Sequence, residues 1–536
     1  MMRGKSFSAV FSVCLAVIGA TGQSSAQSSS PAAAPQLKQA AYLKASNAEA
    51  GDHFGNGGTL DGHSVAISAD GNTMAIAAQN ESSGAKGING SQKDNSVYSS
   101  GAVYVFTRRG NGWEQQAYIK ASNPGQSDVF GYVLALSADG NTLAVSAYFE
   151  ASAATGINGN QDDDSIPQAG AVYVFTRQGA KWSQQAYIKA SNTGEAGVGD
   201  AIGDGDQFGF SLALSQDGNT LAVGAISEDS AAAGINVNDF QRDNSQISSG
   251  AVYLFTRTGA NWTQQAYVKA SNSQAGDLFG YSVALSASGN ILAASGFDEG
   301  GSSRVPNGIP DNLRGGSGVV YVFERTGAAW RQRDYVKGSR SEGADSMGVS
   351  VALSADGNVL AAGVLDEDCT ATGVNPPGCD NDRQADLSAG AVYVWVRNGN
   401  NWREQAFLKA SNTGKDDWFG SRLALSGDGN TLAVGAQLED SAAKGINGKQ
   451  DDDSAEEAGA LYLFTRSGDT WTQQAYVKGS NTEAFDEFGT AMALSSDGKT
   501  MVVTARGEDS AAKGINGHQA DNSADEAGAA YVFIND

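Results

Sequence analysis

The chain contains few of the residues on which catalytic and metal sites are commonly built. It has three histidines and three cysteines in 536 residues. One of the cysteines, Cys14, lies in an apolar N-terminal segment, which leaves Cys369 and Cys379 for the rest of the chain. No nucleophile elbow, phosphate-binding glycine loop or zinc motif is found. The common local signatures of hydrolases, nucleotide-binding enzymes and zinc proteins are therefore missing.

Positive charge is also scarce. The chain has 35 lysines and arginines against 59 acidic residues, a net charge of −24. Binding to nucleic acid needs a basic surface that neutralises phosphates, so we predict no nucleic-acid partner. The acidic surface has two interpretations, a solvated surface that keeps the protein soluble and a surface that attracts cations.

Long apolar runs are confined to the first 26 residues. Arg3 and Lys5 precede an apolar run from Phe7 to Ala20, and Ser24-Ser25-Ala26 follows. This order predicts a signal peptide at residues 1–26, cleaved after Ala26, with a Ser-, Ala- and Pro-rich flexible leader at 27–35. A lipoprotein anchor at Cys14 is the alternative, but the residues before it do not resemble a lipoprotein cleavage box. We predict a secreted, periplasmic or cell-surface protein without membrane insertion.

The remaining chain is repetitive. The segment Gly-Ala-Val-Tyr-Val-Phe or a close variant occurs seven times, 68 to 80 residues apart, and begins at Gly101, Gly170, Gly250, Gly318, Gly390, Gly459 and Gly528. A repeat of this period must be explained before any single residue is assigned a role, because it indicates a repeated structural unit.

One repeat predicts four strands. The third copy has apolar segments at Phe208–Ser215, Leu221–Ala225, Ala251–Thr256 and Trp262–Lys269. Asp217-Gly218 and Thr258-Gly259 supply the turns of two hairpins, since glycine tolerates a positive φ. Four antiparallel strands in about 70 residues are typical of a propeller blade. A solenoid of parallel coils is the main alternative, but it does not need two hairpins in each repeat.

The two ends of the chain complete each other. A fourth-strand tryptophan occurs only six times, and the last copy ends after its third strand. Gln36 to Asn47 matches the fourth strand, with Leu37 in the tryptophan position. We therefore predict an all-β, seven-bladed β-propeller at residues 36–536, closed by the N-terminal strand joining the last blade. Closure removes exposed sheet edges.

Long loops indicate where function lies. In each copy the loop from the second to the third strand and the connection to the next blade are long, and antiparallel geometry puts both on one face. Loops of this length are usually functional or disordered. The acidic residues of these loops include four weak candidates for calcium ligands, namely Asp162, Asp164, Asp451 and Asp453. The alternative is that Asp, Asn and Ser hold the loop backbone through local hydrogen bonds. No other cofactor is predicted.

Three further features have two interpretations each. An Asp stands two residues before the Phe of each Phe-Gly pair, as Asp206 does, and suits a turn or a ligand site. His53 and His63 lie in an enlarged loop of the first blade. They are either ordinary loop residues or a pair of metal ligands. Cys369 and Cys379 lie in one loop of the fifth blade with nine residues between them. Because an exported protein meets oxidising conditions, they predict a disulfide, with a metal site as the less favoured alternative.

The copies resemble the FG-GAP repeats of integrin alpha-subunit propellers and of bacterial secreted proteins. Phe208-Gly209 and Leu221–Ala225 carry the resemblance, which spans about residues 36 to 536. The resemblance implies a propeller that binds ligands on its long-loop face. Integrin-type blades hold calcium in the first hairpin, but that hairpin here keeps a single carboxylate, Asp217. Calcium ligation is therefore not transferred to it.

These observations favour an exported binding or adhesion module. We expect it to recognise an extracellular protein or glycan through the long-loop face, with calcium ordering the loops, and to be a monomer. An alternative is a hydrolase or lyase acting on an extracellular polymer at the same face, with His53 and His63 as the residues to test. A structural surface component is the third hypothesis.

Overall fold

The computed structural model describes residues 37–56, 63–194, 205–236, 241, 243–307, 311–313, 315–379 and 387–535. All of them belong to one unit, residues 37–536. The predicted signal peptide and leader lie outside the described residues. Within the described residues, no helix is long and apolar enough to cross a membrane.

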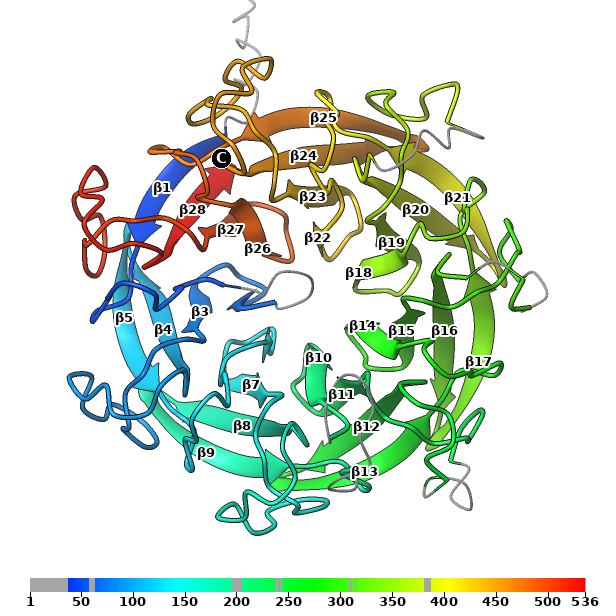
Figure 1. The fold of residues 1–536 in the computed structure, drawn as a ribbon, viewed down its shortest axis with the longest axis horizontal. Coiled ribbons are helices and arrows are strands. Elements are labelled where there is room, and N and C mark those ends of the chain that lie inside the picture. The colour runs from blue at the N-terminus through cyan, green and yellow to red at the C-terminus, as the bar shows by residue number, and fades with distance from the viewer. Residues whose placement is uncertain are drawn as a thin grey trace, which may run out of the picture. The chain divides into compact units, whose positions relative to one another are not determined.

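The described residues form seven four-stranded antiparallel sheets arranged around a ring (Figure 1). The prediction of a seven-bladed β-propeller is therefore confirmed. Blades 1 to 3 consist of β2 (Val65–Ile67), β3 (Thr73–Ala78), β4 (Ala102–Arg109) and β5 (Gly112–Ile119); β6 (Leu134–Leu136), β7 (Thr142–Ala147), β8 (Ala171–Gln178) and β9 (Lys181–Ile188); and β10 (Phe208–Leu214), β11 (Thr220–Ala225), β12 (Ala251–Thr258) and β13 (Asn261–Val268).

The other four blades repeat the order. Blades 4 and 5 consist of β14 (Phe279–Leu285), β15 (Ile291–Gly296), β16 (Val319–Thr326) and β17 (Ala329–Val336); and β18 (Met347–Leu353), β19 (Val359–Val364), β20 (Ala391–Asn398) and β21 (Asn401–Leu408). Blades 6 and 7 consist of β22 (Arg422–Leu425), β23 (Thr431–Ala436), β24 (Ala460–Ser467) and β25 (Thr470–Val477); and β26 (Phe488–Leu494), β27 (Thr500–Ala505), β28 (Ala529–Asn535) and β1 (Leu37–Leu43).

The first hairpin of a blade is held by its own side chains. In blade 3, Ser215 Oγ donates to Asp217 Oδ1, and the Asn219 amide donates to the same oxygen at 3.0 Å. Gly218 follows with φ of +68°. Asp217 thus accepts hydrogen bonds from its own turn, which agrees with assigning it a turn role and no calcium role.

The ring closes where the sequence predicts. β1 pairs antiparallel with β28, and Tyr42 faces Tyr531 with ring centroids 5.4 Å apart. In Figure 1 the dark-blue β1 accordingly lies beside the red β28. The first described strand is therefore the outer strand of the last blade.

A second closure lies near the axis, at the tight turns between the first two strands of each blade. The amide of one turn residue donates to the carbonyl of its counterpart in the next blade, for example from Ala287 to Ala355 at 2.8 Å. The bond from Ser496 to Ala69, 3.0 Å, joins blade 7 to blade 1. The members of this axial ring are Ala69, Ala138, Gln216, Ala287, Ala355, Gly427 and Ser496. It was not predicted, because no side chain encodes it.

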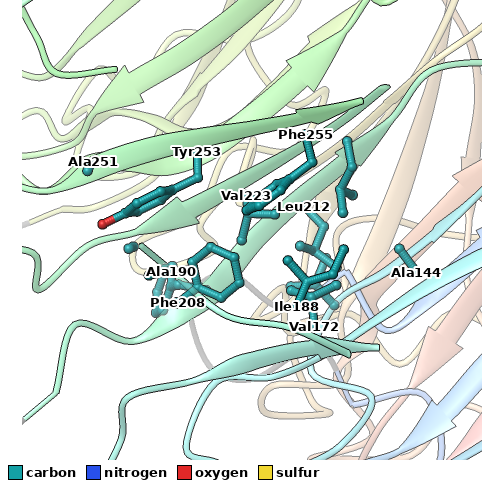
Figure 2. Close-up of a cluster of buried hydrophobic side chains, with 14 of the residues drawn as sticks. Ala144, Val172, Ile188, Ala190, Phe208, Leu212, Val223, Ala251, Tyr253 and Phe255 are labelled. Carbon is teal, nitrogen blue, oxygen red and sulfur yellow. The ribbon is translucent and has the colours of Figure 1, made fainter. Parts of the chain in front are cut away.

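The cores lie between neighbouring blades. Figure 2 shows one cluster, in which Val172 and Ile188 of blade 2 meet Phe208, Val223 and Tyr253 of blade 3. The Phe208 ring packs edge-on against Tyr253 at 5.3 Å. The Phe of the Phe-Gly pair is therefore an inter-blade core residue. The fourth-strand tryptophans are buried too.

Candidate functional site

The long-loop face is built on a buried polar network that repeats around the ring. In blade 3 the Glu228 carboxylate accepts from Tyr267 Oη at 2.7 Å, Lys269 Nζ at 2.7 Å and Asn192 Nδ2 at 2.9 Å. Lys269 is fully buried, and Glu228 nearly so. Asn192 lies in the connection from blade 2, so the network joins two blades. A buried carboxylate with this many donors is satisfied and fixes the start of the long loop.

The same Glu–Tyr–Lys–Asn network occurs in six blades. Its other members are Glu81, Tyr118, Lys120 and Asn47; Glu150, Tyr187, Lys189 and Asn123; Glu299, Tyr335, Lys337 and Asn272; Glu439, Tyr476, Lys478 and Asn412; and Glu508, Tyr42, Lys44 and Asn481. This network was not predicted from the sequence. The signal was a Lys at the end of each fourth strand recurring with the Glu that opens each long loop.

Blade 5 departs from the network. Phe407 replaces the tyrosine, and the guanidinium of Arg340, in the position of the asparagine, lies 4.5 Å from the Phe407 ring centroid. Lys409 donates to the Gly390 carbonyl at 2.6 Å. Burial lowers the pKa of Lys409 to about 8, although nearby Glu367 opposes this shift. Arg340 thus brings positive charge to a site that lacks the tyrosine hydroxyl.

Other residues of the long loop also make structural contacts. The Ile of each Gly-Ile-Asn segment forms a bridge to the fourth strand, as Ile235 does with Val268. The following Asn236 accepts from the Tyr267 amide at 2.9 Å. These contacts cover part of the outer edge strand, which would otherwise expose unpaired backbone groups. Ile235 and Asn236 therefore hold the loop against the fourth strand.

The predicted disulfide is present between Cys369 and Cys379. Cys369 occupies the position of a serine in other blades. That serine closes the same loop by donating Oγ to a carbonyl eight residues later, as Ser441 does to Lys449 at 3.0 Å. The disulfide therefore performs covalently what a hydrogen bond performs elsewhere.

The Asp that precedes each Phe-Gly pair is buried beside the network. Asp128 accepts from the Gly125 amide at 2.6 Å, and Asp486 accepts from Glu483 at 2.8 Å. Both are hydrogen bonds within a turn, as the predicted turn role requires. Burial raises the pKa to about 7, assisted by the neighbouring network Glu, at Asp52, Asp128, Asp277, Asp345, Asp417 and Asp486.

The four calcium candidates lie in the outer parts of their loops. Asp162, Asp164, Asp451 and Asp453 are all exposed. Asp451 pairs with Lys449 at 3.3 Å. Their oxygens have the right chemistry for calcium, but the described part of the chain contains no group of three or more His, Cys, Asp and Glu placed to hold a metal. Calcium binding stays a prediction.

Pockets open where a connection meets the next long loop. In blade 6 a pocket of about 690 Å³ lies between residues 411–417 and 439–453, with Asp440, Asp451 and Asp453 in its wall. Partial burial and the surrounding carboxylates raise the pKa of Asp453. The corresponding pocket of blade 1, about 480 Å³, carries Lys93 and Lys513. The same architecture therefore offers different charges in different blades.

The two histidines of the first blade have separate partners. His53 Nε2 lies 3.2 Å from Glu526 of blade 7. The His63 carbonyl accepts from the Leu134 amide at 2.8 Å. Burial lowers the pKa of His63 to about 4, with a further contribution from the Arg422 charge. His63 is thus neutral at physiological pH.

Several solved structures are similar to this chain at low identity. A putative 6-phosphogluconolactonase from Bacteroides uniformis has 12% identity and a TM-score of 0.43, with 79% of this chain and 87% of that chain covered. The periplasmic gluconolactonase PpgL from Pseudomonas aeruginosa has 13% identity and a TM-score of 0.43, with coverage of 84% and 97%. Hydrazine synthase from Kuenenia stuttgartiensis has 12% identity and a TM-score of 0.44, with coverage of 83% and 93%. No activity is inferred from such distant similarity.

No curated protein matches the chain. The FG-GAP repeat family matches it at four places, residues 113–175, 262–323, 402–464 and 471–533. Each match begins at the tryptophan of a fourth strand and ends in the third strand of the next blade, so it crosses one inter-blade junction. With these matches distributed around a ring of equivalent blades, the chain is an FG-GAP repeat protein with a seven-bladed β-propeller.

Proposed function

We propose that this protein is an exported binding or adhesion propeller that recognises an extracellular protein or glycan through its long-loop face. The observation that carries the proposal is the contrast between the two faces. Tight turns on one face satisfy their own polar groups, as around Asp217. On the other face, ordered loops stand on a rigid buried network and enclose pockets between blades. Variable pockets on a rigid scaffold suit recognition.

A binding screen tests this proposal. The full chain is applied to arrays of glycans and matrix proteins, and each hit is repeated with Asp451→Lys/Asp453→Lys in the blade 6 pocket. Asp469→Lys, on the tight-turn face and 75% exposed, is the control. We expect the pocket variant to lose affinity for its ligand and the control to retain it. Binding that no change on the long-loop face affects would contradict the proposal.

Export and calcium are parts of the same proposal with tests of their own. N-terminal sequencing of exported protein is expected to begin at Gln27. Millimolar calcium is expected to raise the midpoint of thermal unfolding, because calcium would neutralise the exposed Asp pairs 162/164 and 451/453. Asp451→Asn/Asp453→Asn should reduce that rise. An unchanged midpoint would remove calcium from the proposal and leave the binding face in place.

A further inference from the structure

The two residues that end each long loop occupy an equivalent position in all seven blades. They precede the small residue and the glycine that lead into the third strand. The carbonyl of the first residue accepts from the connection to the next blade, as Tyr98 does from the Ser127 amide at 2.9 Å. These loop-end pairs therefore form an ordered ring of side-chain positions on the long-loop face.

The loop-end pairs divide this ring into two sectors. The pairs of blades 1 to 5 are uncharged, namely Tyr98-Ser99, Pro167-Gln168, Ile247-Ser248, Gly315-Gly316 and Leu387-Ser388. Those of blades 6 and 7 are Glu456-Glu457 and Asp525-Glu526. Four carboxylates thus gather at two neighbouring blades, and we call this region the acidic sector.

The carboxylates of the acidic sector reach water. Glu456, Asp525 and Glu526 are exposed, and Glu457 is half-buried. His53 Nε2 lies 3.2 Å from Glu526. Burial lowers the pKa of His53 below its ordinary value of 6.5, so His53 is neutral at physiological pH and leaves the charge of Glu526 in place.

The cation at the junction of blades 6 and 7 is already paired. Arg506 forms an ion pair with Glu487. Partial burial raises the pKa of Glu457, and the like charges of Glu487 and Glu456 raise it further, although Arg506 opposes the shift. The acidic sector therefore holds an excess of negative charge, which favours a positively charged occupant.

The fold itself does not require a carboxylate at these positions. The second residue of the pair has a positive φ, +51° at Glu457 and +52° at Glu526. This conformation is unfavourable for a residue with a side chain, and blade 4 has Gly316 at the same position. The two glutamates are therefore not explained by the needs of the backbone.

Exposed apolar side chains gather on the same face. Those that are at least half exposed among the described residues are Tyr98, Ile247, Val305, Leu313 and Phe485, and all five lie in long loops or connections. Phe485, 53% exposed, lies beside the acidic pair of blade 6, because its amide donates to the Glu456 carbonyl at 2.8 Å. Grouped apolar surface of this kind is typical of interaction sites.

Charged and apolar groups alternate around this part of the ring. Blades 6 and 7 lie between blade 5 and blade 1 (Figure 1). A path along the loop ends from blade 5 to blade 1 meets the half-buried Leu387, then the carboxylates of blade 6. It continues past Phe485, in the connection between the two blades, to the carboxylates of blade 7 and to Tyr98. An occupant that follows this path therefore meets both kinds of surface.

A cavity opens beside the acidic pair of blade 6. It is the pocket of about 690 Å³, whose wall includes Asp440, Asp451 and Asp453. Asp440 Oδ1 accepts from the Glu457 amide at 2.9 Å, so the pocket adjoins the acidic sector. Its carboxylates suit the ammonium group of a lysine or the guanidinium group of an arginine.

We propose that the acidic sector and its flanking apolar residues dock a basic amphipathic segment of a partner protein. This inference rests on the proposed binding function and names the class of partner. Lysine or arginine side chains of the segment pair with the carboxylates of blades 6 and 7. Its apolar side chains cover Leu387, Phe485 and Tyr98.

The combination of charge and apolar surface distinguishes this partner from other occupants. The net charge of −24 disfavours an anionic glycan or an anionic lipid surface. A polyamine would use the carboxylates but leave the apolar side chains in water. A neutral glycan would leave the carboxylate charges unpaired. A segment with both basic and apolar side chains is complementary to both parts of the surface.

Calorimetry with the full chain and three synthetic dodecapeptides tests the inference. The probe alternates leucine and lysine. In the first control peptide serine replaces leucine, and in the second glutamate replaces lysine. We expect the leucine–lysine peptide to bind about tenfold more tightly than the serine–lysine peptide, because only the former buries apolar surface. The leucine–glutamate peptide should not bind, and added salt should weaken the leucine–lysine complex.

Variants of the acidic sector locate the binding site. Glu456→Gln/Glu457→Gln and Asp525→Asn/Glu526→Gln should each weaken the leucine–lysine peptide about fivefold, because exposed ion pairs contribute modestly. Asp162→Asn/Asp164→Asn removes the same charge from exposed positions of the blade 2 loop and should change affinity less than twofold.

A further pair of variants tests the apolar contacts. Phe485→Ala should weaken the leucine–lysine peptide about fivefold and the serine–lysine peptide less than twofold. Leu313→Ala, at a residue 79% exposed in the blade 4 loop, is the control and should change neither. Glu456→Asp/Asp525→Glu keeps both charges and should retain affinity within twofold, which separates lost charge from a disturbed loop.

The inference fails if the leucine–lysine peptide does not bind, or if it binds no more tightly than the serine–lysine peptide. It also fails if the acidic-sector variants and the Asp162/Asp164 control lose affinity equally, because binding would then follow net charge alone. A glycan or matrix protein that binds the long-loop face and is insensitive to every acidic-sector variant would overturn this inference while leaving the proposed function intact.

Discussion

At the scale of single residues, buried charge recurs around this propeller. Lys189 and Glu150 are almost completely withdrawn from water and lie 2.8 Å apart. Such a pair is tolerated only when its remaining hydrogen-bonding groups are satisfied, and Tyr187 and Asn123 supply the further donors to Glu150. Removing one member leaves a charge without its partner, so the cost depends on which member is removed.

The network predicts a graded set of stabilities. Lys269→Met should lower the free energy of unfolding by about 3–5 kcal/mol, because it leaves Glu228 charged and buried without its cation. Tyr267→Phe should cost only about 1–2 kcal/mol, since one neutral donor is lost. Urea unfolding measures both, with Tyr98→Phe at an exposed site as the control. Equal losses for the two variants would show that the lysine is not the main partner of Glu228.

The buried Asp residues predict a pH dependence. Their folded pKa of about 7 exceeds the ordinary value of 3.8, so the folded state binds more protons between these limits. Stability from these groups is therefore fully present below pH 3.8 and is lost as the pH rises through about 7. We expect unfolding free energies to fall between about pH 5 and pH 8 at constant salt.

Asp128→Asn tests the assignment of that pH dependence. An amide oxygen can still accept from the Gly125 amide, which the Asp128 carboxylate does at 2.6 Å, but it carries no charge. The variant should lose part of the decline between about pH 5 and pH 8 and should be relatively more stable at the upper end of that range. A slope identical to that of the parent would mean that Asp128 titrates normally.

At the scale of single elements, the described part of the long loop is anchored several times. Its Glu joins the network, its Ser or Cys closes the loop on itself, and its Ile bridges to the fourth strand. Each anchor recurs in most blades, so the described parts of these loops are held by the same contacts around the ring. The exposed Asp residues lie outside these anchors.

The loop of blade 5 predicts a local effect of its disulfide. Cys369→Ser/Cys379→Ala removes a cross-link over ten residues, for which chain entropy gives about 2–3 kcal/mol. Because the introduced serine hydroxyl could donate to a loop carbonyl as Ser441 does, we expect part of this loss to be recovered. Limited proteolysis should show faster cleavage confined to residues 369–379. Loss of the whole fold would contradict the equivalence of the two closures.

At the scale of the whole molecule, the ring is closed twice. The outer closure is the pairing of β1 with β28, and the inner closure is the axial ring of backbone hydrogen bonds. Neither can form unless every blade is in place, because each joins the last blade to the first. Closure is therefore the most cooperative part of the fold.

Hydrogen exchange should reveal the inner closure. Ala69, Ala287 and Ser496 lie on short turns, and their amides would exchange quickly if only the turn protected them. Because each donates across a blade boundary at 2.8 to 3.0 Å, we expect protection comparable to that of the central strands. Removing residues 1–43, which deletes β1, should abolish this protection, whereas removing residues 1–35 should not. Rapid exchange of these amides in the full chain would refute the axial ring.

Much of the architecture followed from sequence because it depends on local periodicity and on counting. Alternating apolar residues and Asp-Gly turns determine hairpins through their own backbone preferences, and six tryptophans in seven copies implied the closing strand. The disulfide followed from the isolation of Cys369 and Cys379. The candidate calcium ligands Asp162, Asp164, Asp451 and Asp453 stand as predictions, because composition places oxygens in a loop but does not fix their separation.

The sequence by itself determined the number of blades, the strands and the closing partner, since each arises from a pattern repeated along the chain. Only the tertiary structure decided which polar residues are buried, as Glu228 and Lys269 are, and which remain in water. It alone brought Tyr148, Phe297 and Trp418 against one hydrophobic cluster. The physical reason is that burial and contact between blades depend on residues about 70 positions apart, whose meeting is set by ring geometry and not by local preference.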